Sequence, residues 1–304
     1  MLPYLEEQKR LLLIVNPCAG MRKANRQLAD ILSLFMAHGY ESLVCMTEQR
    51  GDAARFVQSR GGEVELIVAV GGDGTLNEVI TGMMAAGIQK PLGYIPAGST
   101  NDFAASLKLD KNILKAAETV VAGETCPLDI GRFGERYFSY VASFGAFTRA
   151  SYATPQNIKN TMGHMAYLLQ GLRDLGSMRP YHVKIETAEE TFEGDYLFGA
   201  ISNTTSVGGV LTLDPKRVDM NDGLFELLLI KYPKGPLEWN ECIRALTTQD
   251  YASHMITFCS TPRLTITASP DMNWTLDGEF EAGHEVVEVE NLYSAIQLQM
   301  KKKT

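Results

Sequence analysis

The sequence lacks the features that mark membrane-spanning and exported proteins. Its longest uninterrupted apolar runs, Leu11 to Val15 and Leu66 to Val70, are far shorter than the ~20 residues that cross a bilayer as a helix. Glu6 and Glu7 stand where a secretory signal needs a basic segment followed by a longer apolar one. We therefore expect a cytoplasmic protein without a membrane span.

Metal-binding and disulfide patterns are also missing. The five cysteines are an odd number without C-x-x-C spacing, and the five histidines contain no H-x-x-x-H pair. These patterns argue against a disulfide framework and a thiolate zinc site, and they give little support to a histidine-built metal site. The formal net charge of -8 opposes binding to nucleic acid, so we expect no nucleic-acid partner.

The chain of 304 residues is long enough for two domains. Up to about residue 124, apolar strand-like runs alternate with helical patterns, which is typical of a doubly wound α/β domain with a parallel sheet. The strands are expected at Leu11–Val15, Leu43–Met46, Leu66–Val70 and Leu92–Ile95. The helices between them carry the apolar sets Leu28, Ile31, Leu32 and Phe35; Ala53, Phe56 and Val57; and Leu76, Val79, Ile80 and Met83.

From about Thr125 to residue 291, short alternating runs predict a mainly antiparallel β-sandwich domain. We expect helical interruptions near His164–Leu175 and Glu238–Leu246, and a final strand, Ser294–Met300, that returns to the first domain within residues 292–304. The other strand-like runs are Tyr137–Phe144, Tyr181–Glu186, Tyr196–Ser202 and Leu224–Ile230.

Four loops of the α/β half begin where strands end. Ligands of open α/β sheets lie beyond the carboxyl ends of the strands, so these loops should converge on one crevice. They are Asn16–Gly20, Thr47–Glu48, Gly71–Thr75 and Pro96–Asp102.

The run Gly71-Gly72-Asp73-Gly74-Thr75 is suited to binding phosphate. Its glycines let backbone N–H groups approach an anion, and the following helix adds its positive N-terminal end. Thr75, Asn77 and Glu78 add polar groups beside it. The run has no P-loop lysine and misses the third glycine of the dinucleotide fingerprint. A tight turn with glycines for packing is the alternative.

The loop Pro96-Ala97-Gly98-Ser99-Thr100-Asn101-Asp102, taken alone, fits a turn and a helix cap as well as a site. With Asn16-Pro17-Cys18-Ala19-Gly20 and the glycine run, however, it resembles the diacylglycerol kinase-like family of bacterial lipid kinases. That family carries N-P-x-x-G, then GGDGT, then P-x-G-T-x-N-D. Ser99 departs from this pattern, since the family usually has threonine at this position. Serine keeps the hydroxyl group and lacks the methyl group.

The resemblance implies that ATP binds in this crevice. The family's nucleotide positions match Asn16, Pro17, Cys18, Ala19, Gly20, Thr47, Gly71, Gly72, Asp73, Gly74, Thr75 and Ser99. We add Asn77, Glu78, Gly98, Asn101 and Asp102 as candidates from the same segments.

In the β half, Asp277-Gly278 between alternating apolar residues predicts a tight hairpin. The resemblance implies more, because the family has a late Asp-Gly-Glu whose aspartate acts as the catalytic base. Asp277 is then the candidate base and Glu279 supports it. A loose phosphoryl-transfer transition state needs little proton abstraction until late, so orienting the hydroxyl should matter more than basicity.

The segment from Asp219 to Leu224 contains two carboxylates three residues apart, before a glycine turn. Such oxygen ligands suit Mg²⁺, although a solvated acidic turn is the alternative. The resemblance implies a magnesium site formed by Asp219, Asp222 and the backbone carbonyl of Leu224. The catalytic Mg²⁺ would arrive separately, with ATP.

The leading functional hypothesis is transfer of the ATP γ-phosphoryl group to a lipid hydroxyl, with diacylglycerol giving phosphatidic acid. An NAD kinase, which shares GGDGT, and a non-catalytic nucleotide or lipid sensor are the alternatives. A lipid acceptor implies peripheral contact with the membrane, for which Phe144, Phe147 and the segment Met162–Leu172 are candidates for an apolar rim. A methionine-rich helical stripe is more often part of a core, which is the alternative for that segment. The oligomeric state stays open, with a homodimer among the alternatives.

Overall fold

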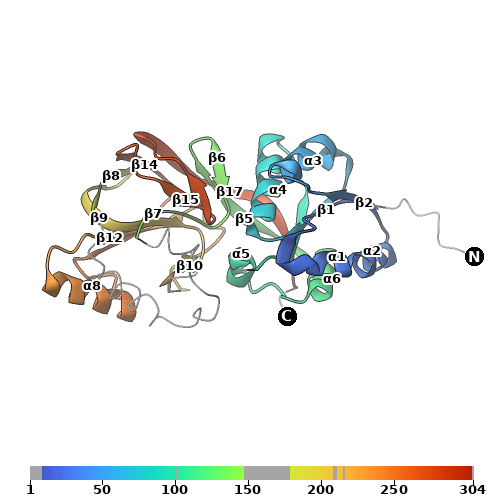
Figure 1. Cartoon of the computed structure of the whole chain (residues 1–304), viewed down its shortest axis with the longest axis horizontal. Helices are drawn as coiled ribbons and strands as arrows, with labels where there is room; N and C mark the ends of the chain where they lie inside the picture. Colours follow the sequence, from blue (N-terminus) through green and yellow to red (C-terminus); the bar gives the residue numbers. More distant parts are fainter. Residues whose placement is uncertain (1–8, 100, 147–178, 208–210, 215, 303–304) are drawn as a thin grey trace, which may run out of the picture. The chain divides into compact units, whose positions relative to one another are not determined.

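The computed structural model describes residues 9–99, 101–146, 179–207, 211–214 and 216–302, and its elements are labelled in Figure 1. The helix predicted over His164–Leu175 and two parts of the predicted rim, Phe147 and Met162–Leu172, lie outside these residues. The chain divides into two compact units. Unit 1 comprises Met1–Leu128 with Ser294–Thr304, and unit 2 comprises Asp129–Tyr293.

Unit 1 is a parallel sheet with helices on both faces. Its strands pair in the order β4-β3-β1-β2, and the end of β17 adds a further parallel strand beside β4. The strands are β1 (Lys9–Val15), β2 (Tyr40–Met46), β3 (Leu66–Gly71), β4 (Pro91–Pro96) and the last part of β17 (Val286–Met300). The helices are η1 (Ala19–Arg22), α1 (Lys23–Arg26), α2 (Leu28–Ala37), α3 (Asp52–Arg60), η2 (Gly61–Glu63), α4 (Asp73–Ala85), α5 (Asp102–Ser106) and α6 (Ile113–Ala122).

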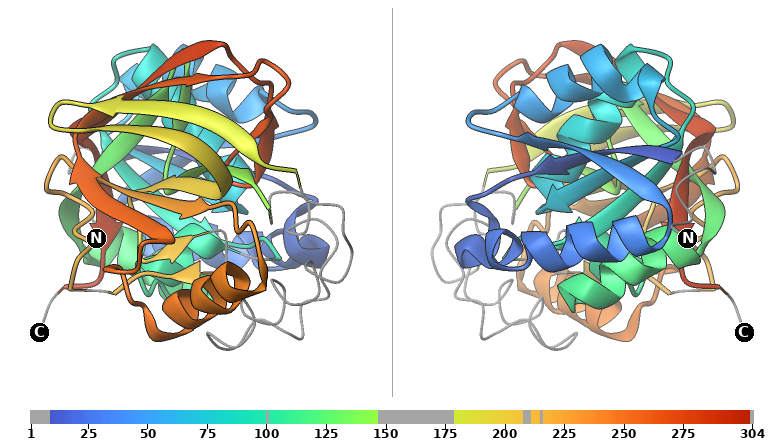
Figure 2. Two further views of the ribbon diagram at one scale, coloured as in Figure 1. Left: turned by 90° about the vertical axis from the view of Figure 1, so that its left-hand side faces the viewer. Right: turned by 90° about the vertical axis from the view of Figure 1, so that its right-hand side faces the viewer.

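The strands β1, β3 and β4 are apolar and buried over most of their length because both faces of the sheet are covered there, whereas the edge strand β2 is only partly buried. Alternate residues of β1 point to opposite faces. Leu11, Leu13 and Val15 share a core with Phe35 of α2 and Val120 of α6. Helices α3 and α4 pack together on the opposite face (Figure 2). This confirms the doubly wound α/β fold that the alternation of patterns predicts.

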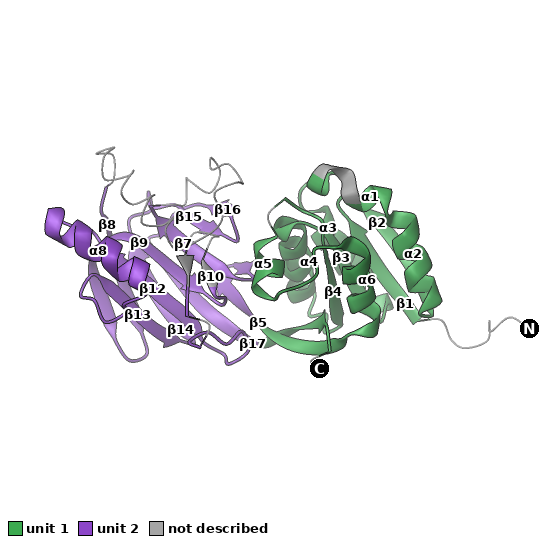
Figure 3. Cartoon of the chain, turned by 90° about the horizontal axis from the view of Figure 1, so that it is seen from below, with its two compact units in different colours: residues 1–128, 294–304 green, residues 129–293 purple. Residues whose placement is uncertain are grey.

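Unit 2, purple in Figure 3, consists mainly of antiparallel strands. One chain of pairings runs β16-β15-β7-β9-β8-β14-β17, while β12 pairs with β9 and β13, and β5 pairs with β6. Its elements are β5 (Glu124–Phe133), which begins in unit 1, β6 (Arg136–Phe138), β7 (Val141–Gly145), β8 (Tyr181–Thr187), β9 (Thr191–Ser202), β10 (Ser206–Val207), β11 (Leu211–Thr212), β12 (Phe225–Lys231), α8 (Pro236–Thr248), β13 (Ile256–Thr261), β14 (Arg263–Ala268), β15 (Trp274–Leu276), β16 (Glu279–Glu281) and the first part of β17.

An apolar core lies among the described strands of unit 2. Side chains from nine of its strands meet there, among them Phe144, Phe225 and Trp274. Phe144 and Trp274 lie with their ring centroids 4.9 Å apart, and Phe144 is only 1% exposed. Phe144 therefore cannot belong to an exposed apolar rim, and that expectation is wrong. Its alternation with polar neighbours already fits an inward-facing strand residue.

The run predicted as one strand, Tyr137–Phe144, is interrupted in the structure. Strand β6 ends at Phe138 and β7 begins at Val141. The backbone N–H groups at the break donate to the carboxylate of Asp277 instead of continuing a strand ladder. A distant side chain thus replaces local pairing.

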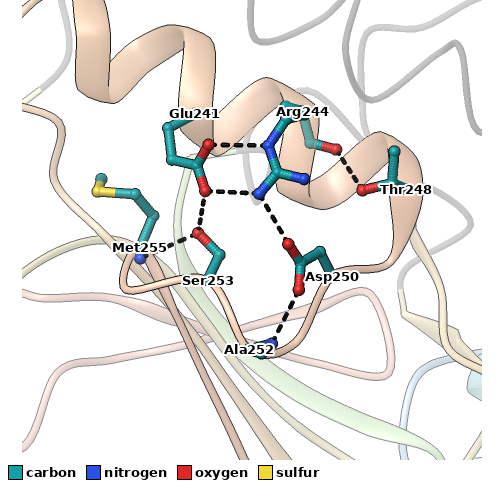
Figure 4. Close-up of polar contacts among 7 residues, drawn as sticks. All are labelled: Glu241, Arg244, Thr248, Asp250, Ala252, Ser253 and Met255. Atoms are coloured by element: carbon teal, nitrogen blue, oxygen red, sulfur yellow. Dashed lines mark hydrogen bonds and ion pairs between the residues drawn. The ribbon is translucent and has the colours of Figure 1, made fainter.

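Helix α8 is fixed to the loop before β13 by a cluster of charged groups (Figure 4). The guanidinium of Arg244 contacts the carboxylates of Glu241 and Asp250 at 2.7 Å each, and the hydroxyl of Ser253 donates to Glu241 at 2.7 Å. Hydrogen bonds from Arg244 and Ser253 lower the pKa of Glu241 to about 2. The cluster joins the last turns of α8 to the chain that follows.

Candidate functional site

The first strand-end loop of unit 1 is bound to the glycine run through Asn16. Its side-chain amide donates to the hydroxyl of Thr75 at 3.2 Å, and its carbonyl oxygen Oδ1 accepts the N–H of Cys18 at 3.0 Å. The backbone N–H of Asn16 donates to Val70 at 2.9 Å, at the end of β3. Asn16 therefore joins two of the loops that the sequence predicts to converge.

The glycine run and the loop after β4 approach each other so closely that side chains would not fit. A Cβ atom on Gly98 would lie 2.5 Å from the Cα of Gly72, and one on Gly20 would lie 2.0 Å from the carbonyl oxygen of Ala97. The side chain of Asn101 accepts the N–H of Gly98 and donates to its carbonyl, both at 2.9 Å. Three predicted loops thus form one surface made largely of backbone.

Asp73 ties the start of α4 to the start of α5. Its carboxylate accepts the backbone N–H of Asp102 at 2.9 Å and that of Phe103 at 3.3 Å. Burial and the nearby carboxylates of Asp73 and Asp102 raise the pKa of the Tyr94 phenol. The acidic side chain of Asp102 therefore lies close to that of Asp73, and two negative charges here would repel a bound phosphate.

Helix α4 starts at Asp73 and follows directly on Gly72, which has no side chain to cap it. The first N–H groups of a helix without a side-chain cap are available to an anion, and the helix dipole favours negative charge there. The residues that precede α4 come from the buried strand β3, so the helix start is held by the core of unit 1. This end of α4 can bind phosphate oxygens.

The remaining nucleotide candidates take different positions. The backbone N–H of Thr47 donates to the carbonyl of Val15 at 2.9 Å, so Thr47 lies beside the end of β1. Asn77 is buried within α4. The carboxylate of Glu78 accepts the N–H groups of Gly51 and Ala53 at 2.9 and 3.2 Å, so it caps the start of α3. Nothing tests the nucleotide roles of these residues, and they stay predictions.

In unit 2, Asp277 and Gly278 form the two-residue turn of the hairpin β15–β16. Leu276 pairs with Glu279, and the φ angles of 49° and 83° at Asp277 and Gly278 are those of a type I′ turn. The predicted hairpin therefore exists. Its first turn residue is the candidate catalytic aspartate.

The side chain of Asp277 is 5% exposed and is held by backbone donors. Oxygen Oδ2 accepts the N–H of Ser139 at 2.5 Å, while Oδ1 accepts those of Tyr140 at 3.0 Å and Val141 at 3.1 Å. Donors of this kind stabilise the ionised carboxylate and fix its orientation. This geometry suits a carboxylate that orients the acceptor hydroxyl. It is less suited to a base that removes the hydroxyl proton early in the reaction.

The predicted supporting residue, Glu279, lies two residues further along the hairpin. Its oxygen Oε2 is 3.4 Å from the guanidinium of Arg136, which also contacts Glu281. Arg136 was not identified from the sequence. No local pattern connects it with Glu279, because the two residues are 143 positions apart.

The segment Asp219–Leu224 forms an acidic loop fixed by its own side chains. Asp219 accepts the N–H of Asn221 at 3.1 Å and Asp222 accepts that of Leu224 at 2.9 Å. The carbonyl of Leu224 accepts a hydrogen bond from Asn291 at 2.9 Å. Among the described residues, no three His, Cys, Asp or Glu side chains converge as a metal-binding group. Two carboxylates, one carbonyl and waters would still suit Mg²⁺.

A buried glutamate lies beneath this loop. Glu226 is 1% exposed, and its oxygen Oε2 has no hydrogen-bond partner within the part of the chain that the structure describes. Burial, together with the charges of Asp222 and Asp219, raises the pKa of Glu226 to about 8. The sequence did hold a signal for this residue, since β12 is otherwise buried and apolar up to Lys231.

This pKa predicts a pH-dependent stability. The carboxyl of Glu226 ionises near 4.5 in the unfolded chain and near 8 in the folded one. The folded state therefore binds the proton more tightly, and its stability falls as pH rises between these values. We expect Glu226→Gln to remove about 3 kcal/mol of that fall. Denaturant unfolding with a chelator, at about pH 5 and about pH 8, measures it.

The exposed Glu288 provides the control for this experiment. Glu288→Gln removes the same charge from unit 2 and should leave the pH dependence of the free energy of unfolding unchanged. If wild type and Glu226→Gln lose stability in parallel as pH rises, Glu226 does not titrate as its burial indicates.

Comparison with known proteins covers nearly the whole chain. The family model "Diacylglycerol kinase catalytic domain" matches residues 10–133, and "YegS C-terminal NAD kinase beta sandwich-like domain" matches residues 141–299. The Bacillus subtilis diacylglycerol kinase is 37% identical over 300 residues, which cover 97% of each chain. A Staphylococcus epidermidis diacylglycerol kinase is 33% identical over 277 residues, covering 90% of this chain and 86% of its own.

Solved structures share the fold. A diacylglycerol kinase from Bacillus anthracis superposes with a TM-score of 0.75 at 22% identity, covering 97% of this chain and 98% of its own. Within the described residues, no helix is both long and apolar enough to span a bilayer.

Proposed function

We propose that this chain, which belongs to the diacylglycerol kinase family, transfers the γ-phosphoryl group of ATP to the hydroxyl of diacylglycerol and so forms phosphatidic acid. The observation that carries the proposal is the backbone-lined surface of unit 1, where Asn16, Gly72, Gly98 and Asn101 meet. Relatives over 30% identical along nearly the whole chain carry that kinase name.

Unit 1 supplies the nucleotide site in this proposal. The start of α4 and the loops that end at Gly20 and Asp102 would bind the phosphates through N–H groups. No basic side chain of the P-loop kind follows Gly74, where the hydroxyl oxygen of Thr75 instead accepts a hydrogen bond from the side-chain amide of Asn16. Neutralising charge would then come from the Mg²⁺ bound with ATP, beside Asp73 and Asp102.

Unit 2 supplies the acceptor side. Asp277 orients the lipid hydroxyl and receives its proton late in the transfer, and Glu279 supports it from the same hairpin. The bond between the terminal phosphorus of ATP and its bridging oxygen breaks, and the lipid oxygen takes its place. ADP leaves with the bridging oxygen.

A second Mg²⁺ at Asp219, Asp222 and the Leu224 carbonyl would organise the acidic loop. The buried Glu226 supports this proposal, because a cation nearby would offset three neighbouring carboxylates. Mg²⁺ supplies charge neutralisation and orientation when bound. The chain's own residues fix the loop through Asn291 and backbone hydrogen bonds.

The acceptor resides in a bilayer, so the enzyme has to touch the membrane surface. Phe280 supports such contact, since its side chain is 62% exposed on the hairpin that carries Asp277. Aromatic side chains favour the interface between lipid and water. We propose peripheral association from the cytoplasmic side.

A kinase assay tests the proposed function. Purified protein, γ-labelled ATP and Mg²⁺ are incubated with diacylglycerol in mixed micelles, alongside a panel of other lipid alcohols. We expect label in phosphatidic acid. Absence of label in every lipid would refute the proposal, and formation of NADP from NAD would assign the chain to the NAD kinases instead.

A further inference from the structure

The outer strand of the hairpin that carries Asp277 has little support of its own. Strands β15 and β16 contain three residues each, and β16 is an edge whose described strand partner is β15. Side chains Trp274 and Leu276 anchor β15 in the core, but the side chain of Phe280 is largely exposed. Strand β15 also pairs with β7, so the sheet and the core hold β15, whereas β15 is the strand beside β16 that the structure describes. Contacts from elsewhere must fix β16.

Arg136 of β6 provides these contacts. One guanidinium nitrogen, Nη1, donates to the carbonyl oxygen of Phe280 at 3.2 Å and also to the carboxylate of Glu281. The other, Nη2, donates to Oε2 of Glu279 at 3.4 Å. A planar guanidinium can bind several acceptors in a fixed geometry, which a lysine ammonium cannot reproduce. Arg136 thus binds both carboxylates of β16 and one of its backbone carbonyl groups.

The charge of Arg136 also offsets repulsion within the hairpin. Glu279 and Glu281 are two residues apart on a strand, so their side chains lie on the same face. Asp277 adds a third carboxylate at the turn. The ring nitrogen Nε2 of His284 contacts the second oxygen of Glu281 at 3.0 Å. Removing Arg136 would leave the carboxylates of Glu279 and Glu281 close together without the positive charge between them.

The same short segment also holds the reactive carboxylate. Three residues after Arg136, the N–H groups of Ser139, Tyr140 and Val141 bind Asp277, and the N–H of Asp277 donates to Val141 at 2.9 Å. The segment 136–141 therefore forms hydrogen bonds with the hairpin both at its turn and along β16. A displacement of β16 would be transmitted directly to the orientation of the Asp277 carboxylate.

We propose that Arg136 is a positioning residue for phosphoryl transfer, which holds Asp277 in its reactive orientation by binding Glu279, Phe280 and Glu281. This inference rests on the proposed function. A misplacement of about 1 Å at a reacting group can lower the rate by ~100-fold. Arg136 acts through Asp277 and lies outside the nucleotide loops, so its loss should lower kcat and spare ATP binding.

The test compares Arg136→Gln with Arg244→Gln. Arg244 is a matched control, since it also bridges two carboxylates of unit 2, those of Glu241 and Asp250 (Figure 4). We expect Arg136→Gln to lower kcat for diacylglycerol by about 10-fold or more, with KM for ATP changed by less than about 2-fold. Arg244→Gln should leave both kinetic constants close to those of wild type.

A conservative variant separates positioning from general destabilisation. Arg136→Lys keeps the charge and one or two of the contacts, so it should recover part of the lost kcat. Glu281→Gln should lower kcat less than Arg136→Gln, and adding it to Arg136→Gln should cause little further loss, because the two residues share one interaction. Fully additive losses would contradict the assignment.

Hydrogen exchange provides a readout that does not depend on turnover. In Arg136→Gln the amides of β16 and of Ser139 to Val141 should exchange faster, while those of unit 1 keep their protection. If wild type phosphorylates no lipid, the proposed function fails, yet this exchange still tests the contact. If wild type is active and Arg136→Gln has unchanged kcat, the inference about Arg136 fails alone.

Discussion

Replacing Asp277 by asparagine is expected to lower kcat for the lipid by about 100-fold or more, while the protein still binds ATP. The carboxylate is needed to orient the acceptor hydroxyl and to receive its proton in the transition state. ATP binding belongs to the loops of unit 1, so the Kd for ATP should change little. Steady-state kinetics and calorimetry with ATP measure the two quantities separately.

The substitution Asp277→Asn removes hydrogen bonds as well as a charge. Both carboxylate oxygens accept backbone N–H groups, whereas asparagine offers one oxygen and turns an NH2 group toward those donors. We therefore expect Asp277→Asn also to destabilise unit 2 by about 2 kcal/mol. The loss of kcat must then be measured at temperatures where the variant remains folded.

Asp271→Asn is the control for this prediction, because Asp271 is exposed and precedes the same hairpin. It should keep both kcat and stability. An Asp277→Asn protein with wild-type kcat would remove Asp277 from the reaction. A loss of activity no greater than the loss of folded protein would leave it a purely structural role.

Replacing Asp73 by asparagine is expected to weaken ATP binding in the presence of Mg²⁺ by about 10-fold. The side chain would lose an acceptor for the N–H groups of Asp102 and Phe103, which loosens the contact between the two loops. It would also lose a negative charge that would help to hold the Mg²⁺ bound with ATP. Calorimetric titration with ATP measures the Kd.

The dependence on Mg²⁺ gives this experiment its sharpest outcome. Two carboxylates, Asp73 and Asp102, lie near the proposed phosphate site and repel a nucleotide that carries no metal. Without Mg²⁺, Asp73→Asn should therefore bind ATP as well as wild type or better. Asp110→Asn is the control, since Asp110 also accepts a backbone N–H in unit 1. Equal losses with and without Mg²⁺ would contradict a metal-linked role.

The nucleotide loops could be predicted from the sequence because each begins where an apolar strand ends. Asn16, Gly72 and Gly98 lie in short motifs whose order already indicates a shared crevice, and their contacts follow from the parallel sheet. The hairpin that contains Asp277 could be predicted from the sequence in the same way. Asp-Gly flanked by alternating residues specifies a type I′ turn without reference to the rest of the chain.

The contacts that hold this hairpin could not be predicted in the same way. The N–H groups that bind Asp277 belong to Ser139, Tyr140 and Val141, which precede Asp277 by 136 to 138 positions in the chain. Arg136 contacts Glu279 across a separation of 143 positions. Alternation in Tyr137–Phe144 indicates one strand, whereas the bonds to Asp277 divide it in two. Long-range bonds to a side chain leave no trace in local periodicity.

The central proposal is that the enzyme transfers phosphate to a lipid by a reaction that needs Asp277. The most direct measurement incubates wild type and Asp277→Asn with γ-labelled ATP, Mg²⁺, diacylglycerol micelles and NAD in one mixture, and separates the lipid and nucleotide products. We expect labelled phosphatidic acid with wild type, almost none with the variant, and no labelled NADP with either. Labelled NADP, or equal lipid labelling by both proteins, would contradict it.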